Sequence, residues 1–133
     1  MTGLSSTTRA TGRPEVEPAL VDRAVLDALL ADVGGDAEFV AELVQTYLGD
    51  APSNLRDIEA AIAAGDSAAL VRPAHTLKSS SASVGAMRLS AIARSLEAAG
   101  REGRAEGLEA ELATVLTAWP ATVVAFREAW ITE

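Results

Sequence analysis

The sequence predicts an all-α protein, an antiparallel up-down four-helix bundle with a short additional helix in front of it. Hydrophobic residues make up 49% of the 133 residues but aromatic residues only 4%, which favours helices packed through alanine and leucine over a sheet. From Asp22 onward the apolar residues recur at helical spacing. Short glycine-containing turns separate the long segments, as in antiparallel bundles. We expect one domain over residues 21–133, preceded by a flexible tail over residues 1–20.

The first two helices are predicted from their caps and their apolar spacing. Asp22 is a candidate N-cap for a short helix that ends at two successive glycines, and Asp36 can cap the second helix. The apolar residues of the second segment keep one phase across Pro52, although proline commonly breaks or kinks a helix. Two separate helices would have no reason to share one phase. We therefore expect a single long, kinked helix over about residues 36–64.

The third helix is expected over Ser67–Ser83, after a stop at Gly65 and a candidate N-cap at Asp66. Pro73 lies inside this segment, where it removes a backbone donor and is expected to kink the helix. The buried row of the third helix follows steps of four and three: Leu70, Ala74, Leu77, Ser81 and Val84.

The last two helices are predicted to form the rest of the bundle. The fourth covers about residues 86–99 and is expected to end at Gly100, and the last begins near Leu108 and bends at Pro120. The apolar row of the last helix slips by one residue near that proline: Leu108, Leu112, Val115, Trp119, Val123, Phe126 and Trp130.

Charge and composition exclude several classes of function. The formal net charge of −8 argues against nucleic-acid binding, which needs a basic face to neutralise phosphates. No apolar run approaches the roughly 18 residues of a membrane span, and no signal-peptide pattern is present. The absence of cysteine excludes disulfides and thiolate sites. We expect a cytoplasmic monomer that binds neither nucleic acid nor membrane.

His75 is the only histidine of the chain and the strongest candidate for a functional residue. No other side chain has an ordinary pKa that makes it a neutral nitrogen nucleophile near pH 7. Lys78 and Arg72 lie within one helical turn of it and supply cations, and Ser79 leaves the ring accessible. Adjacent cations stabilise the charge of a phosphorylated imidazole. The row that contains His75 flanks the buried one and should be partly exposed: Val71, His75, Lys78 and Ala82.

The run from Ala74 to Ala86 resembles the histidine-containing phosphotransfer (HPt) domain of bacterial phosphorelays. That family has a His-x-x-Lys-Gly/Ser-small-small motif followed by Gly-Ala or Gly-Leu. Two departures stand out: Ser79 occupies a position where many members have glycine, and Pro73 lies two residues before the histidine. The residues that match the motif are His75, Lys78, Ser79, Ser80, Ser81, Gly85 and Ala86, and the similarity extends over about residues 22–130 through Phe39, Pro52, Gly65-Asp66 and Leu96-Glu97.

The resemblance implies a phosphorelay intermediary without kinase activity of its own. His75 would accept a phosphoryl group on Nε2 from a receiver-domain aspartate or a histidine kinase and pass it to a response-regulator aspartate. Lys78 would offset the charge and Ser79 would provide clearance. The partners would be receiver domains of response regulators or hybrid histidine kinases. The receiver would supply Mg²⁺, so no metal or cofactor is expected on this chain. The expected partner-binding residues are Val71, Arg72, Lys78, Ser79 and Ala82.

Three other interpretations compete. In the dimerisation domain of a histidine kinase, an acidic residue usually follows the histidine, and Thr76-Leu77 does not match that pattern. A carboxylate-bridged di-metal bundle needs Glu-x-x-His pairs, but Arg72 stands three residues before His75. A non-catalytic helical adaptor that docks receiver domains remains as the alternative function.

Overall fold

The computed structural model describes residues 18–131, and in this range it contains helices, turns and no strand. Residues 1–17 of the predicted tail lie outside the described part of the chain. The all-α prediction is confirmed. The elements, in chain order, are α1 (Arg23–Asp32), α2 (Ala37–Ala64), α3 (Ser67–Ser83), α4 (Met87–Arg101), α5 (Glu109–Phe126) and a π-helical turn, η3 (Arg127–Ile131).

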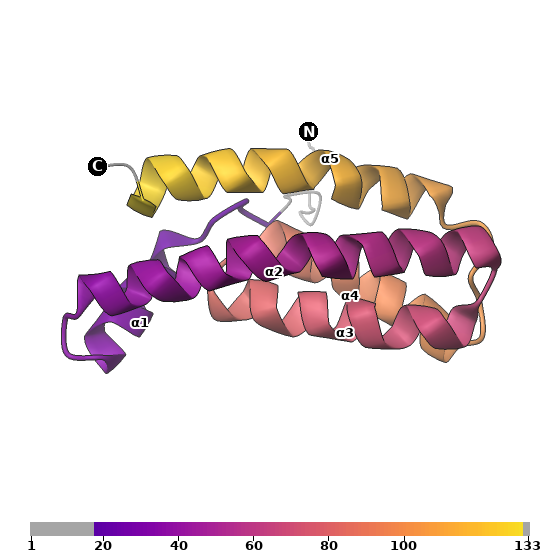
Figure 1. Cartoon of the computed structure of the whole chain (residues 1–133), viewed down its shortest axis with the longest axis horizontal. Coiled ribbons are helices and arrows are strands. Elements are labelled where there is room, and N and C mark those ends of the chain that lie inside the picture. Colours follow the sequence, from indigo (N-terminus) through magenta and orange to yellow (C-terminus); the bar gives the residue numbers. More distant parts are fainter. Residues whose placement is uncertain (1–17, 132–133) are drawn as a thin grey trace, which may run out of the picture.

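The helices α2 to α5 run alternately in opposite directions along one long axis, and α1 leads into α2 at one end (Figure 1). In Figure 1, the hairpin of α3 and α4 lies along one side of α2, and α5 lies along the other side. Packing joins α2 to α3, α3 to α4, and α5 to both α4 and α2, so the four helices close into a bundle.

Aspartate caps set the starts of the first three helices. The carboxylates of Asp36 and Asp66 each accept a hydrogen bond of 3.0 Å from the backbone N–H three residues later. The carboxylate of Asp22 accepts one of the same length from the backbone N–H of Ala24. Each cap satisfies a donor that the first turn of a helix leaves unpaired. The predicted bounds of α3 are confirmed, and α2 continues through Pro52 as one helix.

The prediction that Gly100 ends the fourth helix is wrong. Helix α4 continues to Arg101, and Gly100 is buried against α3. A Cβ atom at this position would lie 3.0 Å from the carbonyl oxygen of Ser67 and 3.0 Å from a methyl group of Val71. Glycine is present here because the two helices approach each other closely, a role that the linear sequence does not distinguish from a stop signal.

The predicted row of the last helix also needs correction. Helix α5 continues through Pro120 to Phe126, and Ala118 and Thr122 are buried where the sequence suggested Trp119 and Val123. Trp119 packs partly buried against the core, and the side chain of Trp130 lies outside the described residues. From sequence, the large apolar Trp119 is favoured for the buried position over the small Ala118, whereas the packing buries Ala118.

The interior is built mainly of aliphatic side chains with a small aromatic cluster near one end. Tyr47 of α2 forms edge-to-face contacts with Trp119 and Phe126 of α5, at ring-centroid distances of 5.9 and 5.8 Å. Its hydroxyl group shares a 2.7 Å hydrogen bond with Ser81 of α3. The fully buried large side chains are Phe126, Leu26, Ile58, Leu70, Leu77, Leu89, Leu96, Leu108, Val40, Val44, Val115 and Thr122.

Candidate functional site

Helix α3 places His75 at the surface of the bundle. The side chain of His75 is 52% exposed, whereas its neighbour Ala74 is completely buried. This is the flanking position that the apolar row predicts, because consecutive helical residues are about 100° apart around the axis. All five members of the predicted buried row are buried. Pro73 is buried inside α3, and the helix is continuous past it.

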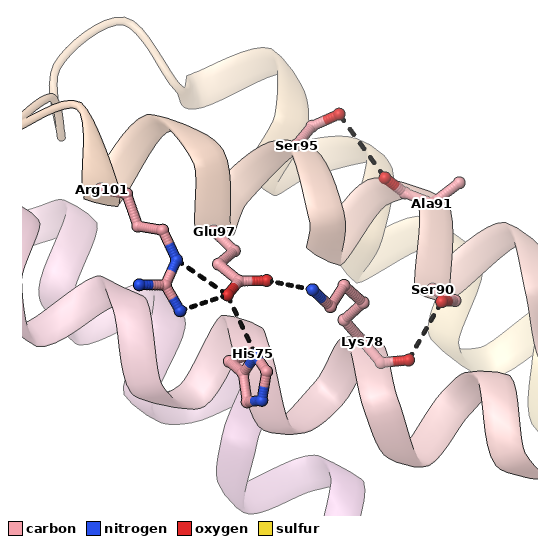
Figure 2. A network of polar contacts seen from close by, with 7 residues as sticks. All are labelled: His75, Lys78, Ser90, Ala91, Ser95, Glu97 and Arg101. Carbon is pink, nitrogen blue, oxygen red and sulfur yellow. Dashed lines mark hydrogen bonds and ion pairs between the residues drawn. The ribbon is translucent and has the colours of Figure 1, made fainter.

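A single carboxylate on α4, that of Glu97, binds the histidine ring (Figure 2). His75 Nδ1 lies 3.0 Å from Glu97 Oε2, and the Glu97 side chain is only 6% exposed. The other oxygen, Oε1, lies 2.7 Å from Lys78 Nζ. Two of the predicted site residues, His75 and Lys78, are therefore held together by a third residue on the next helix.

Arg101 contacts the same carboxylate from one helical turn farther along α4. Its Nε and Nη2 atoms donate hydrogen bonds of 3.0 and 2.7 Å to Glu97 Oε2. In Figure 2, Arg101 and Lys78 approach Glu97 from opposite sides, with the His75 ring between them. The buried carboxylate thus has three partners, of which two are permanent cations at neutral pH.

The contacts with Glu97 determine which ring nitrogen of His75 is free. Hydrogen bonds from Lys78 and Arg101, outweighing the opposing effect of burial, lower the pKa of Glu97 to about 2. The carboxylate is therefore ionised near pH 7 and can only accept hydrogen bonds, so Nδ1 of His75 must be the donor. In a neutral ring, Nε2 then carries the lone pair, and it lies on the side of the ring away from Glu97 (Figure 2).

Contacts between α3 and α4 fix the positions of these side chains. Ser90 of α4 donates a 3.0 Å hydrogen bond to the backbone oxygen of Lys78 (Figure 2). One turn beyond Glu97, Gly100 lies directly against Val71, one turn before His75. The His75–Glu97 distance is therefore set by close packing on one side of the site and by a polar contact on the other.

The structure places the remaining predicted site residues in different surroundings. Ser79 is exposed one turn after His75, and Lys78 is 30% exposed. Arg72, predicted as a second cation near His75, lines a hollow between α2 and α3 together with Asp57 and Asp66. The second cation that contacts Glu97 is Arg101.

Sequence reasoning missed the roles of Glu97 and Arg101. The sequence points to Glu97 only through the family resemblance, and it does not single out Arg101. Glu97 occurs between Leu96 and Ala98 on a helix whose apolar residues point inward, and a carboxylate there is seldom buried without partners. Only the pairing of α3 with α4 brings it within 3.0 Å of His75.

A groove of about 310 Å³ lies between α2 and α3, and its lining includes Thr76, the residue that follows His75. Thr76 and Ser80 form its α3 wall, and Leu43 and Tyr47 form part of its α2 wall. Leu29 of α1 also lines it. The predicted docking residues Val71 and Ala82 do not line this groove. Its lining is mainly apolar and includes several polar side chains, a mixture found on transient interaction surfaces.

Residues 18–131 contain no cluster of three or more histidine, cysteine, aspartate or glutamate side chains arranged for a metal ion. In the same part of the chain, no helix has the length and apolar character needed to cross a membrane.

The fold and site together define a helical-bundle protein that presents a half-exposed histidine, anchored by a buried carboxylate, at its surface. The sequence model of the Hpt domain matches residues 42–129 of this chain. The chain belongs to the Hpt domain family. Hpt domains are phosphotransfer intermediates, not kinases, and they work with histidine kinases and response regulators.

Two solved structures are similar to this one. Histidine-containing phosphotransfer protein B (HptB) of Pseudomonas aeruginosa PAO1 is 28% identical, with a TM-score of 0.74 over 86% of this chain and 96% of that chain. The HPT domain of a sensor hybrid histidine kinase from Shewanella is 20% identical, with a TM-score of 0.67 over 82% of this chain and 92% of that chain. At 20% identity, the similarity to this second structure shows a shared fold alone. A search of curated protein sequences finds no match.

Proposed function

We propose that His75 is the phosphoacceptor of a phosphorelay, taking a phosphoryl group from the aspartate of a receiver domain or from a histidine kinase and passing it to a response-regulator aspartate. The observation that carries this proposal is the state of the ring: Nδ1 is bound to a buried, ionised carboxylate, and Nε2 is free on an exposed side chain.

The chemistry is a nucleophilic displacement at phosphorus. The Nε2 lone pair attacks the phosphoryl group, an N–P bond forms, and the P–O bond to the aspartate breaks to release its carboxylate. The ring keeps its proton on Nδ1 and becomes positively charged as the new bond forms. Glu97 faces that proton and stabilises the charge, as the aspartate of a Ser-His-Asp triad does for its histidine.

Lys78 and Ser79 support this step in different ways. A phosphoryl group on His75 carries about −1.5 to −2 charges by analogy with phosphoserine, and the Lys78 ammonium group lies one turn away on the same helix. Ser79 is small and exposed, so it leaves space for the approaching donor.

The decisive experiment is phosphotransfer from a phosphorylated receiver domain, with the position of the phosphate mapped afterwards. The wild-type protein should acquire an acid-labile, base-stable phosphate, and the variant His75→Gln should acquire none, because glutamine offers no nucleophilic nitrogen. Circular dichroism should show that the variant remains folded, since the side chain is half exposed. Label that persists on His75→Gln would disprove the assignment, and a wild-type protein that binds the receiver but takes no phosphate would indicate the adaptor function.

We also propose that the receiver domain docks on the groove between α2 and α3, because this apolar surface adjoins the exposed face of α3 that carries His75. The interface would then combine residues of α2 and α3, as the sequence predicts for a surface around His75, with Ser79 at its edge.

The groove can be tested with Leu43→Glu, which places a charge on its α2 wall. The affinity for the receiver should fall on the order of ten-fold, as expected when an interface loses an apolar contact and buries a charge. Glu42→Gln, on the neighbouring exposed position, serves as the control. Equal receiver affinities of Leu43→Glu and wild type, measured by calorimetry, would place the docking surface elsewhere.

A further inference from the structure

We propose that Arg101 is a positioning residue for His75: it holds the Glu97 carboxylate in place while Lys78 leaves that carboxylate to bind the phosphoryl group. The inference rests on the proposed function of His75 and adds to it a division of labour between the two cations.

The contacts around Glu97 suggest this division because one carboxylate has two cations on different oxygens. Lys78 binds Oε1 at 2.7 Å, whereas Arg101 binds Oε2, the oxygen that also accepts the His75 proton. One cation would neutralise the single charge of Glu97. With a second cation in place, the first can bind another group without leaving Glu97 unpaired.

Lys78 is the cation that is able to leave. It carries one compact charge on a flexible stem, and it lies on the same helix as His75, one turn away. A phosphoryl group on Nε2 would bring about two negative charges close to it, compared with the single charge of Glu97. We expect the ammonium group to move from Glu97 Oε1 to the phosphoryl oxygens.

Arg101 is the cation that stays. It lies four residues after Glu97 on the same helix and makes two hydrogen bonds from one rigid guanidinium group, at 3.0 and 2.7 Å. Without it, departure of Lys78 would leave a buried carboxylate with no permanent cation and a phosphoryl dianion nearby. Glu97 would then turn away or take up a proton, and His75 would lose its acceptor at Nδ1.

The test compares the unphosphorylated and phosphorylated protein by ¹H–¹⁵N spectroscopy of the His75 ring. Phosphoramidate supplies the phosphoryl group, so no receiver is needed. The variants are Arg101→Gln, Arg101→Lys and the control Arg104→Gln, an exposed arginine in the loop after α4 that donates a hydrogen bond to the backbone oxygen of Glu106. Arg101 is 59% exposed, so its replacement should leave the fold intact, which circular dichroism verifies.

In the unphosphorylated protein, Arg101→Gln should keep the Nδ1–H signature of wild type, because Lys78 still holds Glu97. After phosphorylation, exchange of the Nδ1 proton with water should become on the order of ten-fold faster in Arg101→Gln, the effect of losing a charge-assisted hydrogen bond. Arg101→Lys should restore slow exchange in part, and Arg104→Gln should match wild type.

Equal effects of Arg101→Gln in both states, or no effect in either, would overturn the proposal. So would a phosphorylated Arg104→Gln protein that behaves like Arg101→Gln, since the effect would then reflect net charge alone. Failure of transfer between His75 and a receiver would count against the proposed function, and it would leave this spectroscopic comparison intact.

Discussion

At the scale of single residues, Glu97 organises the site. Its buried carboxylate selects the ring nitrogen of His75 that keeps a proton and holds the ammonium group of Lys78 beside the ring. The cost of burying a charge is offset because every neighbour donates a hydrogen bond to it. The site therefore depends on a residue that never needs to touch the phosphoryl group.

The pKa of Glu97 predicts how acid affects stability. Because the folded-state pKa is lowered from 4.5 to about 2, the ionised form stabilises the folded state above pH 4.5, and this contribution is lost as the pH falls toward 2. Glu97→Gln should lower the free energy of unfolding by about 1.5–3 kcal/mol at pH 7, the range for hydrogen bonds to charged groups. Urea unfolding should show that the difference from wild type shrinks between pH 4.5 and 2.

Glu102→Gln is the control for this measurement, because it removes an exposed carboxylate just beyond α4. A stability difference between Glu97→Gln and wild type that stays constant with pH would contradict the pKa of Glu97.

At the scale of secondary-structure elements, the close packing of α3 and α4 sets the geometry of the site. Gly100 permits the approach of Val71 and the backbone of Ser67, and the His75–Glu97 pair lies one turn away along both helices. A change in helix separation at Gly100 should therefore alter the distance between His75 Nδ1 and Glu97.

This packing can be tested with two glycine substitutions that differ only in their surroundings. Gly49→Ala in α2 should raise the free energy of unfolding by about 0.5–1 kcal/mol, because alanine favours the helix and its Cβ meets no atom within 4 Å. Gly100→Ala should instead lower it by about 1–3 kcal/mol, because its Cβ would press on α3 at 3.0 Å. Thermal unfolding measures both.

The Gly100→Ala protein should also lose phosphotransfer rate, while Gly49→Ala should transfer like wild type. Stabilisation by both substitutions would show that α3 and α4 are not packed as closely as the structure describes.

At the scale of the whole molecule, α5 completes the bundle through the aromatic cluster. Phe126 and Trp119 pack against Tyr47 of α2, whose hydroxyl group bonds Ser81 of α3. Burial raises the pKa of Tyr47 to about 12, although its hydrogen bond with Ser81 opposes the shift, so the hydroxyl stays protonated over the physiological range. One side chain thus links three helices.

Phe126→Ala should lower the free energy of unfolding by about 3–5 kcal/mol, because it leaves a large cavity at a completely buried position. Denaturant unfolding followed by tryptophan fluorescence and by circular dichroism should give coincident transitions if the bundle is one cooperative unit. Val124→Ala, on the exposed face of the same helix, should cost well under 1 kcal/mol. Similar losses for both variants would mean that α5 is not docked through Phe126.

The sequence by itself determined the local elements of this protein. Apolar spacing and aspartate caps predicted the span of α3 and the continuity of α2, because both depend on residues close together in the chain. The same spacing predicted that His75 lies beside the buried row rather than in it. Its motif with Lys78 and Ser79 indicated the family that the comparisons confirm.

Only the tertiary structure decided which residues from different helices meet. Gly100 has the sequence signature of a helix end, yet it is the point where α4 approaches α3. Glu97 and Arg101 become part of the site because α4 packs beside α3. The physical reason is that helical periodicity orients a side chain around its own axis, whereas the partner that it meets depends on how the helices pack.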